Sequence, residues 1–301
     1  MDTRPRLLLL AVVLLAAALG TTPSLAQGPA WTADLATVRR VAALVPGRRP
    51  LRVNVVKFAE SRRTMNFSVK GAPADPSVQA RTAFQVVYAD GTVMVDAGMN
   101  QQVHNFFGRG VVEPYDADAA RQVEAAVDRA RLIVVTHEHG DHVGGVIASP
   151  QAAALARKTI LTRTQLQVLS TTPQMPDIRL TPDTARGYLV VDYDAYHPVA
   201  PGMAFIRAAG HTPGSQMVYI VLESGREILL AGDATWHMDG VRKTIGKDAP
   251  WITEDQPAVL GQLQWLNALS REAPGLVVVA SHDDDERRAL VARGVLGGRF
   301  E

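Results

Sequence analysis

The chain of 301 residues carries 31 lysines and arginines against 30 aspartates and glutamates, a formal net charge of +1 at pH 7. No field of one sign is available to gather nucleic acid or an anionic membrane, so neither is expected as a partner. Cysteine is absent from the sequence, which excludes disulfides, thiolate metal ligands and an acylated-cysteine anchor.

The first residues are ordered like a signal peptide. The basic start M-D-T-R-P-R precedes an apolar run over residues 7–19, and Ser24-Leu25-Ala26 offers a small-residue cleavage site. The run is short for a membrane span, although an uncleaved anchor is the alternative. We therefore expect residues 1–26 to be removed on export to the periplasm or the exterior, with no stable membrane insertion afterwards. Residues 27–50 then form an N-terminal extension, and residues 51–301 form the main domain.

The first part of the mature chain is predicted to contain a short helix and three strands. Thr32 is a candidate cap for the helix. Asp90-Gly91 is a strong two-residue turn signal, so the runs on either side form a hairpin. Residues 59–81 mix charges, glycine and prolines without periodicity and are predicted to be a loop over the site. The helix and strands cover residues 32–44, 51–58, 83–88 and 92–95.

The middle of the chain is predicted to alternate helices, strands and two irregular segments. Residues 99–110 are predicted to be a loop; its Phe106 and Phe107 are candidates for a substrate pocket, with core packing as the alternative. Residues 164–182 contain Met175 and three prolines and are a second candidate substrate-shaping loop. Helices are expected at 116–129 and from Ser149-Pro150 to 157, and strands at 132–135 and 159–162.

The remaining chain is predicted to build a second sheet and to end in a helix. Asp255 is expected to cap a helix, followed by a buried strand at 276–280 and a helix at 286–293. Strands followed by helices in both halves indicate an α/β fold. The strands of the second sheet are expected at 188–191, 204–208, 217–222 and 227–230.

One segment combines a buried strand with an unusual density of metal-binding side chains. Residues 132–145 read L-I-V-V-T-H-E-H-G-D-H-V-G-G. His137 and His139 are two residues apart, so in an extended segment they project to the same side and can hold one ion. A turn at Gly140 brings Asp141 and His142 to a second position nearby. Core packing does not require such a cluster, which therefore indicates a metal site.

The pattern H-x-H-x-D-H at a strand end is the signature of the metallo-β-lactamase superfamily, which the chain resembles from about residue 51 to its end. Three later segments resemble the family's other ligand elements in the right order: A-G-H-T-P-G-S, L-L-A-G-D-A and V-V-V-A-S-H-D, at residues 209–215, 229–234 and 277–283. The resemblance implies an αβ/βα four-layer sandwich, in which two mixed β-sheets are flanked by helices and the metals lie in a cleft at one edge.

The resemblance also implies a ligand set. His137, His139 and His211 would hold one metal, Asp141, His142 and His282 a second, and Asp233 would bridge them. Asp141 and Asp233 are thus the candidate catalytic residues, and Asp96 would support the metal loop through hydrogen bonds. Nitrogen and carboxylate ligands suit two Zn²⁺ ions and leave Mn²⁺ or Fe²⁺ open. The remaining imidazoles and an acidic run are expected to be ordinary structural or solvated groups: His104, His197, His237 and residues 283–285.

The family's metal pair shares a hydroxide, so the resemblance implies an exported hydrolase in which that hydroxide attacks a lactone or other ester carbonyl. The bridging Asp233 and the T-P-G-S segment are most similar to N-acyl homoserine lactonases, which have a tyrosine where this chain has Trp236. Trp236 therefore joins Phe106 and Phe107 as a candidate pocket residue. β-Lactam hydrolysis is the main alternative, and a thioesterase or an iron-dependent oxidoreductase remain further ones. A small-molecule substrate is expected, and a homodimer is open.

Overall fold

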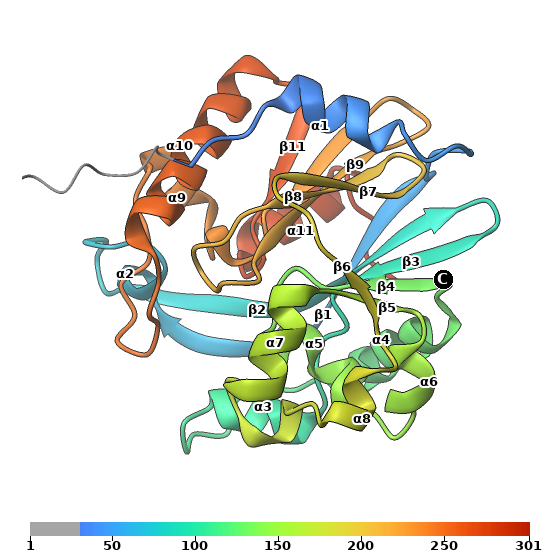
Figure 1. Cartoon of the computed structure of the whole chain (residues 1–301). Helices are drawn as coiled ribbons and strands as arrows, with labels where there is room; N and C mark the ends of the chain where they lie inside the picture. Colours follow the sequence, from blue (N-terminus) through green and yellow to red (C-terminus); the bar gives the residue numbers. More distant parts are fainter. Residues whose placement is uncertain (1–30) are drawn as a thin grey trace, which may run out of the picture.

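Two mixed β-sheets pack face to face with helices on both outer sides (Figure 1). The computed structural model describes residues 31–301; the predicted signal peptide and the first residues of the extension lie outside this range. The arrangement confirms the four-layer α/β sandwich that the sequence predicted. Among the described residues, no helix is both long and apolar enough to cross a bilayer.

The first sheet has six strands in the order of the chain. Its first three strands are antiparallel, β3 to β6 are parallel, and Gly91 has a φ of 146° at the predicted turn between β2 and β3. A glycine accommodates this backbone because it has no Cβ. The strands are β1 (Arg52–Thr64), β2 (Pro76–Tyr88), β3 (Gly91–Val95), β4 (Leu132–Val134), β5 (Thr159–Thr162) and β6 (Leu189–Val191).

The second sheet has five strands in the order β11-β10-β9-β8-β7. The inner faces of both sheets supply apolar side chains to a shared core. It includes Val86, Val95, Phe205 and Ile220, which are all fully buried. Burial of this apolar surface holds the sheets together. The strands are β7 (Tyr196–Ala200), β8 (Met203–Arg207), β9 (Gln216–Val221), β10 (Glu227–Leu230) and β11 (Leu276–Val279).

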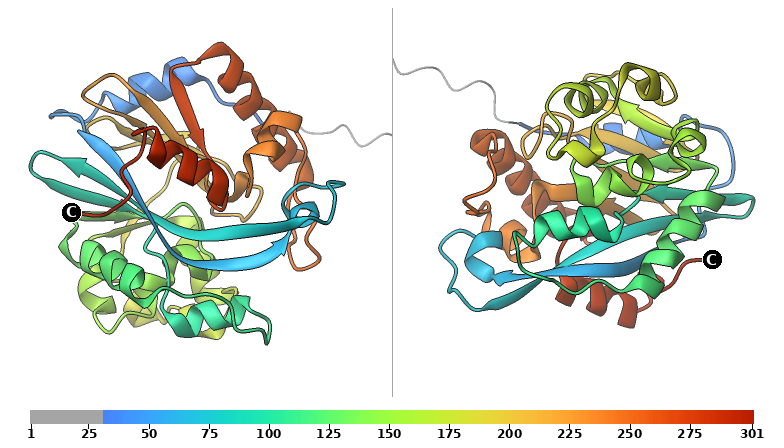
Figure 2. Two further views of the ribbon diagram at one scale, coloured as in Figure 1. Left: turned by 180° about the vertical axis from the view of Figure 1, so that it is seen from behind. Right: turned by 90° about the horizontal axis from the view of Figure 1, so that it is seen from below.

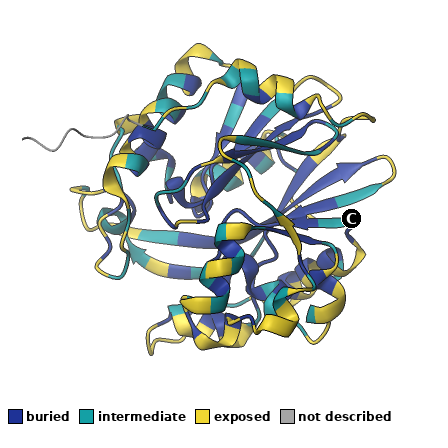
Figure 3. Cartoon of the chain, in the orientation of Figure 1, coloured by how far each residue is buried: buried dark blue, intermediate teal, exposed yellow. Residues whose placement is uncertain are grey.

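Helices cover the outer face of each sheet and turn their exposed sides to solvent (Figure 3). Val38 of α1 and Leu263 of α10 are buried against the second sheet, whereas α3 to α8 gather on the side of the first sheet (Figure 1). The helices are α1 (Leu35–Ala42), α2 (Met65–Ser68), α3 (Gln101–Phe107), α4 (Ala117–Arg129), α5 (Gly140–Ile147), α6 (Ala152–Ala156), α7 (Arg163–Thr171), α8 (Pro182–Ala185), α9 (Met238–Lys243), α10 (Gln256–Glu272) and α11 (Asp284–Ala292), with 3₁₀ turns η1 (Pro176–Ile178) and η2 (Gly232–Ala234).

The prediction of a loop at residues 59–81 was wrong. β1 and β2 are each 13 residues long and pair from Ala59↔Arg81 to Thr64↔Pro76, with α2 in the connection. The hairpin curves across the molecule, and α2 lies beside the segment after α9 (Figure 2), where the N–H of Lys70 donates to the carbonyl of Gly246. The buried positions of this hairpin include polar side chains that bond one another, so the sequence shows no apolar alternation there.

Both other predicted loops contain helices. In residues 99–110, Asn100 caps α3 by accepting a hydrogen bond from the N–H of Val103. At the start of the second segment, residues 164–182, α7 begins with a reciprocal capping box between Thr162 and Gln165. Both are known helix-start patterns, and their satisfied backbone N–H groups explain why helices form here.

Several boundaries also differ from the predictions. Asp34 rather than Thr32 caps α1, and α6 begins at Ala152 rather than directly after Ser149. The strand predicted near 188–191 joins the first sheet as β6, and the second sheet instead gains β7, which the sequence did not predict. The hairpin around Asp90-Gly91, the helix at 116–129 and the Asp255 cap all agree with the predictions.

The acidic run at residues 283–285 is not wholly solvated, contrary to expectation. Asp283 is buried and accepts hydrogen bonds from the N–H groups of Met238 and Glu286, both at 2.9 Å. Asp284 is also buried and lies 3.2 Å from Nζ of Lys57. Two of the three carboxylates therefore hold α11 in place, Asp283 by capping its first turn and Asp284 by its ion pair with Lys57.

Candidate metal centre

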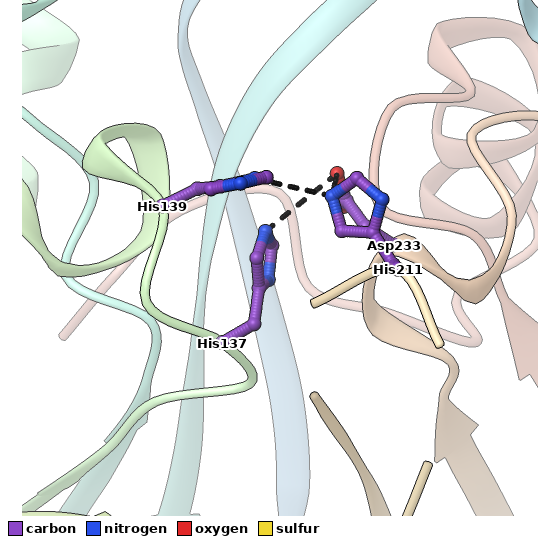
Figure 4. A group of neighbouring side chains, drawn as sticks. All are labelled: His137, His139, His211 and Asp233. Carbon is purple, nitrogen blue, oxygen red and sulfur yellow. Dashed lines mark hydrogen bonds and ion pairs between the residues drawn. The ribbon is translucent and has the colours of Figure 1, made fainter. Parts of the chain in front are cut away.

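All seven predicted ligand side chains converge at one edge of the sandwich, although they come from four separate segments. They form two groups: His137, His139, His211 and Asp233 in the first, and Asp141, His142 and His282 in the second. Within each group, one ligand atom per residue lies within 4.8 Å of the others. The side chains of the first group face one another in Figure 4.

The carboxylate of Asp233 lies between the two groups. Its Oδ2 is 3.3 Å from Nε2 of His211 and 3.8 Å from Nε2 of His137. Its Oδ1 is 3.4 Å from Nε2 of His142 and 3.2 Å from Nε2 of His282. One aspartate therefore faces both groups, which is the position that the sequence assigned to a bridging ligand.

The donor set fits a pair of divalent cations. The Nε2 atoms of His137 and His142 are buried without a hydrogen-bond partner among the described residues. A buried polar atom without a partner costs free energy, and one cation bound in each group would remove that cost. Imidazole nitrogens and carboxylate oxygens without thiolate are ligands that zinc accepts.

Hydrogen bonds on the far side of the rings fix their orientation. Nδ1 of His142 is 2.8 Å from Oδ2 of Asp96, whose Oδ1 accepts from the N–H of Thr136 at 2.7 Å. Nδ1 of His282 lies 2.7 Å from the carbonyl of Ala80. A ring that donates from Nδ1 presents the lone pair of Nε2 to the centre. Asp96 thus makes the contacts to the metal loop that the sequence predicted.

A buried lysine and a buried glutamate support His211, and neither was predicted from the sequence. Nδ1 of His211 lies 2.5 Å from Oε1 of Glu254, and Nζ of Lys247 lies 2.9 Å from the same oxygen. Lys247 also donates to the main-chain carbonyls of Asp233 and Ala234. No motif marks either residue, because their partners are brought close only by the fold.

Arg81 is the other residue that the sequence did not reveal, since it falls in the segment predicted as a loop. Its Nη1 donates to Oδ2 of Asp141 and lies 3.4 Å from Nε2 of His282, while Nη2 donates to Oγ of Ser61 at 3.0 Å. The guanidinium also stacks on the ring of Phe107, 4.9 Å from its centroid. A permanent positive charge therefore borders the second group of ligands.

The pKa values of the buried ligand histidines are shifted in opposite directions. Burial lowers the pKa of His137 well below its usual value and that of His139 to about 3, so both rings are neutral. Burial also lowers the pKa of His142, but the carboxylates of Asp141 and Asp96 outweigh it and raise that pKa well above its usual value. In the first group, burial and Lys247 lower the pKa of His211, but its hydrogen bonds to Asp233 and Glu254 outweigh them and raise that pKa. Cation binding therefore competes with protons in both groups.

Trp236 is engaged with the bridging aspartate. Its Nε1–H donates to Oδ2 of Asp233 at 2.7 Å, and the hydroxyl of Ser281 donates to Oδ1 at 2.5 Å. The indole has a single polar hydrogen, so no further donor remains for a substrate oxygen. Trp236 thus positions Asp233 and offers the substrate only its ring.

A cleft of about 490 Å³ opens onto the metal ligands. All three candidate pocket residues line it, together with aromatic and basic side chains that the sequence did not single out. His104, His197 and His237 join neither ligand group among the described residues, as expected. The lining includes Phe106, Phe107, Trp236, Trp251, Arg63, Arg81 and Arg109.

The sequence profile of the Metallo-beta-lactamase superfamily matches residues 78–282, about two thirds of the chain. The chain belongs to the metallo-β-lactamase superfamily. Curated relatives within this superfamily include an N-acyl homoserine lactonase from Bacillus sp, 24% identical over 66% of this chain and 79% of its own length. The N-acyl homoserine lactonase AiiA of Bacillus thuringiensis subsp. kurstaki is 22% identical over 66% and 80%.

Solved structures of the superfamily share the fold. An N-acyl homoserine lactone hydrolase, with the product N-hexanoyl-L-homoserine bound at its catalytic metal centre, superposes with a TM-score of 0.64 at 16% identity, covering 80% of this chain and 96% of its own. AidC, a dizinc quorum-quenching lactonase, gives 0.56 at 14% identity, covering 79% and 91%. The family and its side-chain set make this chain a metal-dependent hydrolase.

Proposed function

We propose that this metal-dependent hydrolase opens lactones or closely related esters at a dinuclear metal site. The observation that carries the proposal is the position of Asp233, whose two oxygens face separate groups of ligand side chains at 3.2–3.8 Å. The curated relatives named above are N-acyl homoserine lactonases, which supports a lactone as the substrate.

The residues would hold two metal ions as the sequence resemblance implied. His137, His139 and His211 would bind one, and Asp141, His142 and His282 the other, with Asp233 shared. When bound, such ions supply Lewis acidity and a water of lowered pKa. The histidine and carboxylate donors suit zinc.

The protein's own contribution is to hold these groups still. Trp236 and Ser281 each bind one oxygen of Asp233, so its carboxylate cannot rotate freely. Phe106 and Phe107 give the cleft an apolar wall, which favours the carbon skeleton of a substrate and excludes water from it. The positive charge of Arg81 at the second group would favour the carboxylate that ester hydrolysis forms.

Export is part of the proposal and rests on sequence alone. The basic, apolar and small-residue order of residues 1–26 is typical of a cleaved signal peptide. The enzyme would then act in the periplasm or outside the cell. Sequencing the N-terminus of secreted protein tests this, since Gln27 at the start supports cleavage and Met1 contradicts it.

A substrate panel on the zinc-loaded mature chain tests the reaction. An N-acyl homoserine lactone, an aryl ester and a carbapenem would be compared, each with a chelated control. We expect lactone or ester turnover that chelation abolishes, and that Asp233→Ala loses together with bound metal. The exposed Asp285 supplies the matched control, and Asp285→Ala should keep both. A carbapenem rate above the lactone rate by orders of magnitude would contradict the proposal.

A further inference from the structure

The charge of the cleft is uneven. Its lining includes three arginines, Arg63, Arg81 and Arg109, but the only carboxylates that line it within residues 31–301 are Asp141 and Asp233. Both carboxylates are candidate metal ligands, so bound cations would neutralise their negative charge. The formal charge of the whole chain is only +1. The cleft of the loaded protein is therefore a local concentration of positive charge.

Arg109 differs from the other two arginines because it has no carboxylate partner among the described residues. Arg63 forms an ion pair with the buried Glu113 and donates to the carbonyl of Phe107 at 2.8 Å. Arg81 is bound to Asp141. The guanidinium carbon of Arg109 instead lies 4.6 Å from the ring centroid of Trp251. Stacking uses the face of the guanidinium and leaves its N–H edge free to bind a ligand.

The surroundings keep Arg109 in place at the cleft. Trp251 is itself packed against Phe67, with ring centroids 4.9 Å apart, and against Arg63, whose guanidinium carbon is 5.7 Å away. Arg109 has a φ of 50°. This left-handed backbone is uncommon for residues with a side chain, and it places Arg109 in the turn between Gly108 and Gly110 that follows α3.

We propose that the substrate carries a carboxylate remote from its scissile ester, and that Arg109 binds this carboxylate at the mouth of the cleft. The inference rests on the proposed esterase or lactonase activity and adds its substrate class. A single guanidinium matches the single charge and planar geometry of a carboxylate. Phe106 and Phe107 line the same cleft and suit the apolar chain between the two ends.

A matched pair of substrates tests the proposal. One is a homoserine lactone whose six-carbon acyl chain ends in a carboxylate, and the other ends in the uncharged carboxamide of the same size. Wild-type enzyme should prefer the carboxylate, and Arg109→Gln should lower its kcat/KM about tenfold through KM, because a charge-assisted hydrogen bond is lost. The carboxamide should change by less than about twofold. Arg109→Lys should retain part of the preference.

Two controls distinguish binding by Arg109 from a nonspecific effect of positive charge on the protein surface. Arg62 is the neighbour of Arg63 in β1, but its side chain is 72% exposed and does not line the cleft, so Arg62→Gln should leave both substrates unaffected. Raising the ionic strength should weaken the carboxylate preference of the wild type, since exposed charges are screened. Equal losses on both substrates in Arg109→Gln, or no loss on either, would overturn the proposal.

A binding measurement distinguishes failure of this proposal from failure of the proposed function. Calorimetric titration of the zinc-loaded protein with adipate needs no turnover. Adipate should bind wild type at least several-fold more tightly than Arg109→Gln. If no ester is hydrolysed but this difference is present, the activity is wrong and the anion site stands; if esters are hydrolysed and the difference is absent, the anion site is wrong.

Discussion

Removing one partner of the buried pair Lys247 and Glu254 should destabilise the fold far more than removing one partner of a surface pair of the same chemistry. The side chains are 1% and 0% exposed, with Nζ 2.9 Å from Oε1. Burial raises the pKa of Glu254, but Lys247 and His211 outweigh it, so the carboxylate is ionised. Lys247→Met keeps the volume and removes the charge, which leaves this carboxylate without its cation.

Removing one partner of a buried ion pair costs about 3–5 kcal/mol, because the other charge stays buried and uncompensated. Lys243 is the control, since its side chain is 54% exposed in an i,i+4 pair with Asp239. Such a pair contributes about 0.3–0.5 kcal/mol. Lys247→Met should therefore be destabilising by several times more than Lys243→Met.

Urea unfolding of the metal-free protein measures both variants, with an unchanged m-value as the check that the transition is comparable. The double variant Lys247→Met with Glu254→Gln removes the stranded charge and should recover at least part of the loss, because glutamine still accepts from His211. Equal free energies of unfolding for Lys247→Met and Lys243→Met would refute the reasoning.

Three further predictions concern the metal centre. Trp236→Phe removes the N–H bound to Asp233 but keeps an aromatic ring, so metal affinity measured by chelator competition should fall about 10- to 100-fold; unchanged affinity would show that the bond does not position the carboxylate. Because Asp141 and Asp96 raise the pKa of His142, its ring is protonated in metal-free protein at neutral pH, and zinc must displace that proton. Adding zinc in a weakly buffered indicator solution should therefore release protons, and metal binding should weaken as the pH falls; no release contradicts the assignment. Chelation should lower Tm, and excess zinc should restore it in a concentration-dependent way; calorimetric scans with equal Tm would argue against a bound ion.

The ligand side chains could be predicted because each lies in a short segment, at the end of an apolar run, that resembles a ligand element of the family. His137, His139, Asp141 and His142 are within six residues, and the fold places them as that spacing requires. Buried apolar runs and turn signals likewise predicted the α/β architecture. These features depend on near neighbours in the chain, which a sequence displays directly.

The supporting residues could not be predicted in the same way. Arg81 is 60 residues from Asp141, and Glu254 is 43 residues from His211. A buried charge at such a separation shows no period or motif of its own. Buried polar residues also obscure the secondary structure. The polar positions of β1 and β2 around Arg81 interrupt the apolar alternation that is typical of strands, so this segment was predicted to be a loop. Helix α7 was missed for a different reason, because its capping box at Thr162 was not recognised.

Metal content tests the central claim most directly. Mature protein loaded with zinc and passed through metal-free buffer would be analysed by inductively coupled plasma mass spectrometry, beside Asp233→Ala. The arrangement of seven side chains around Asp233 predicts about two ions per chain, and a clear loss in the variant. Wild-type protein that retains no zinc, manganese or iron, or a variant that keeps the full amount, would contradict it.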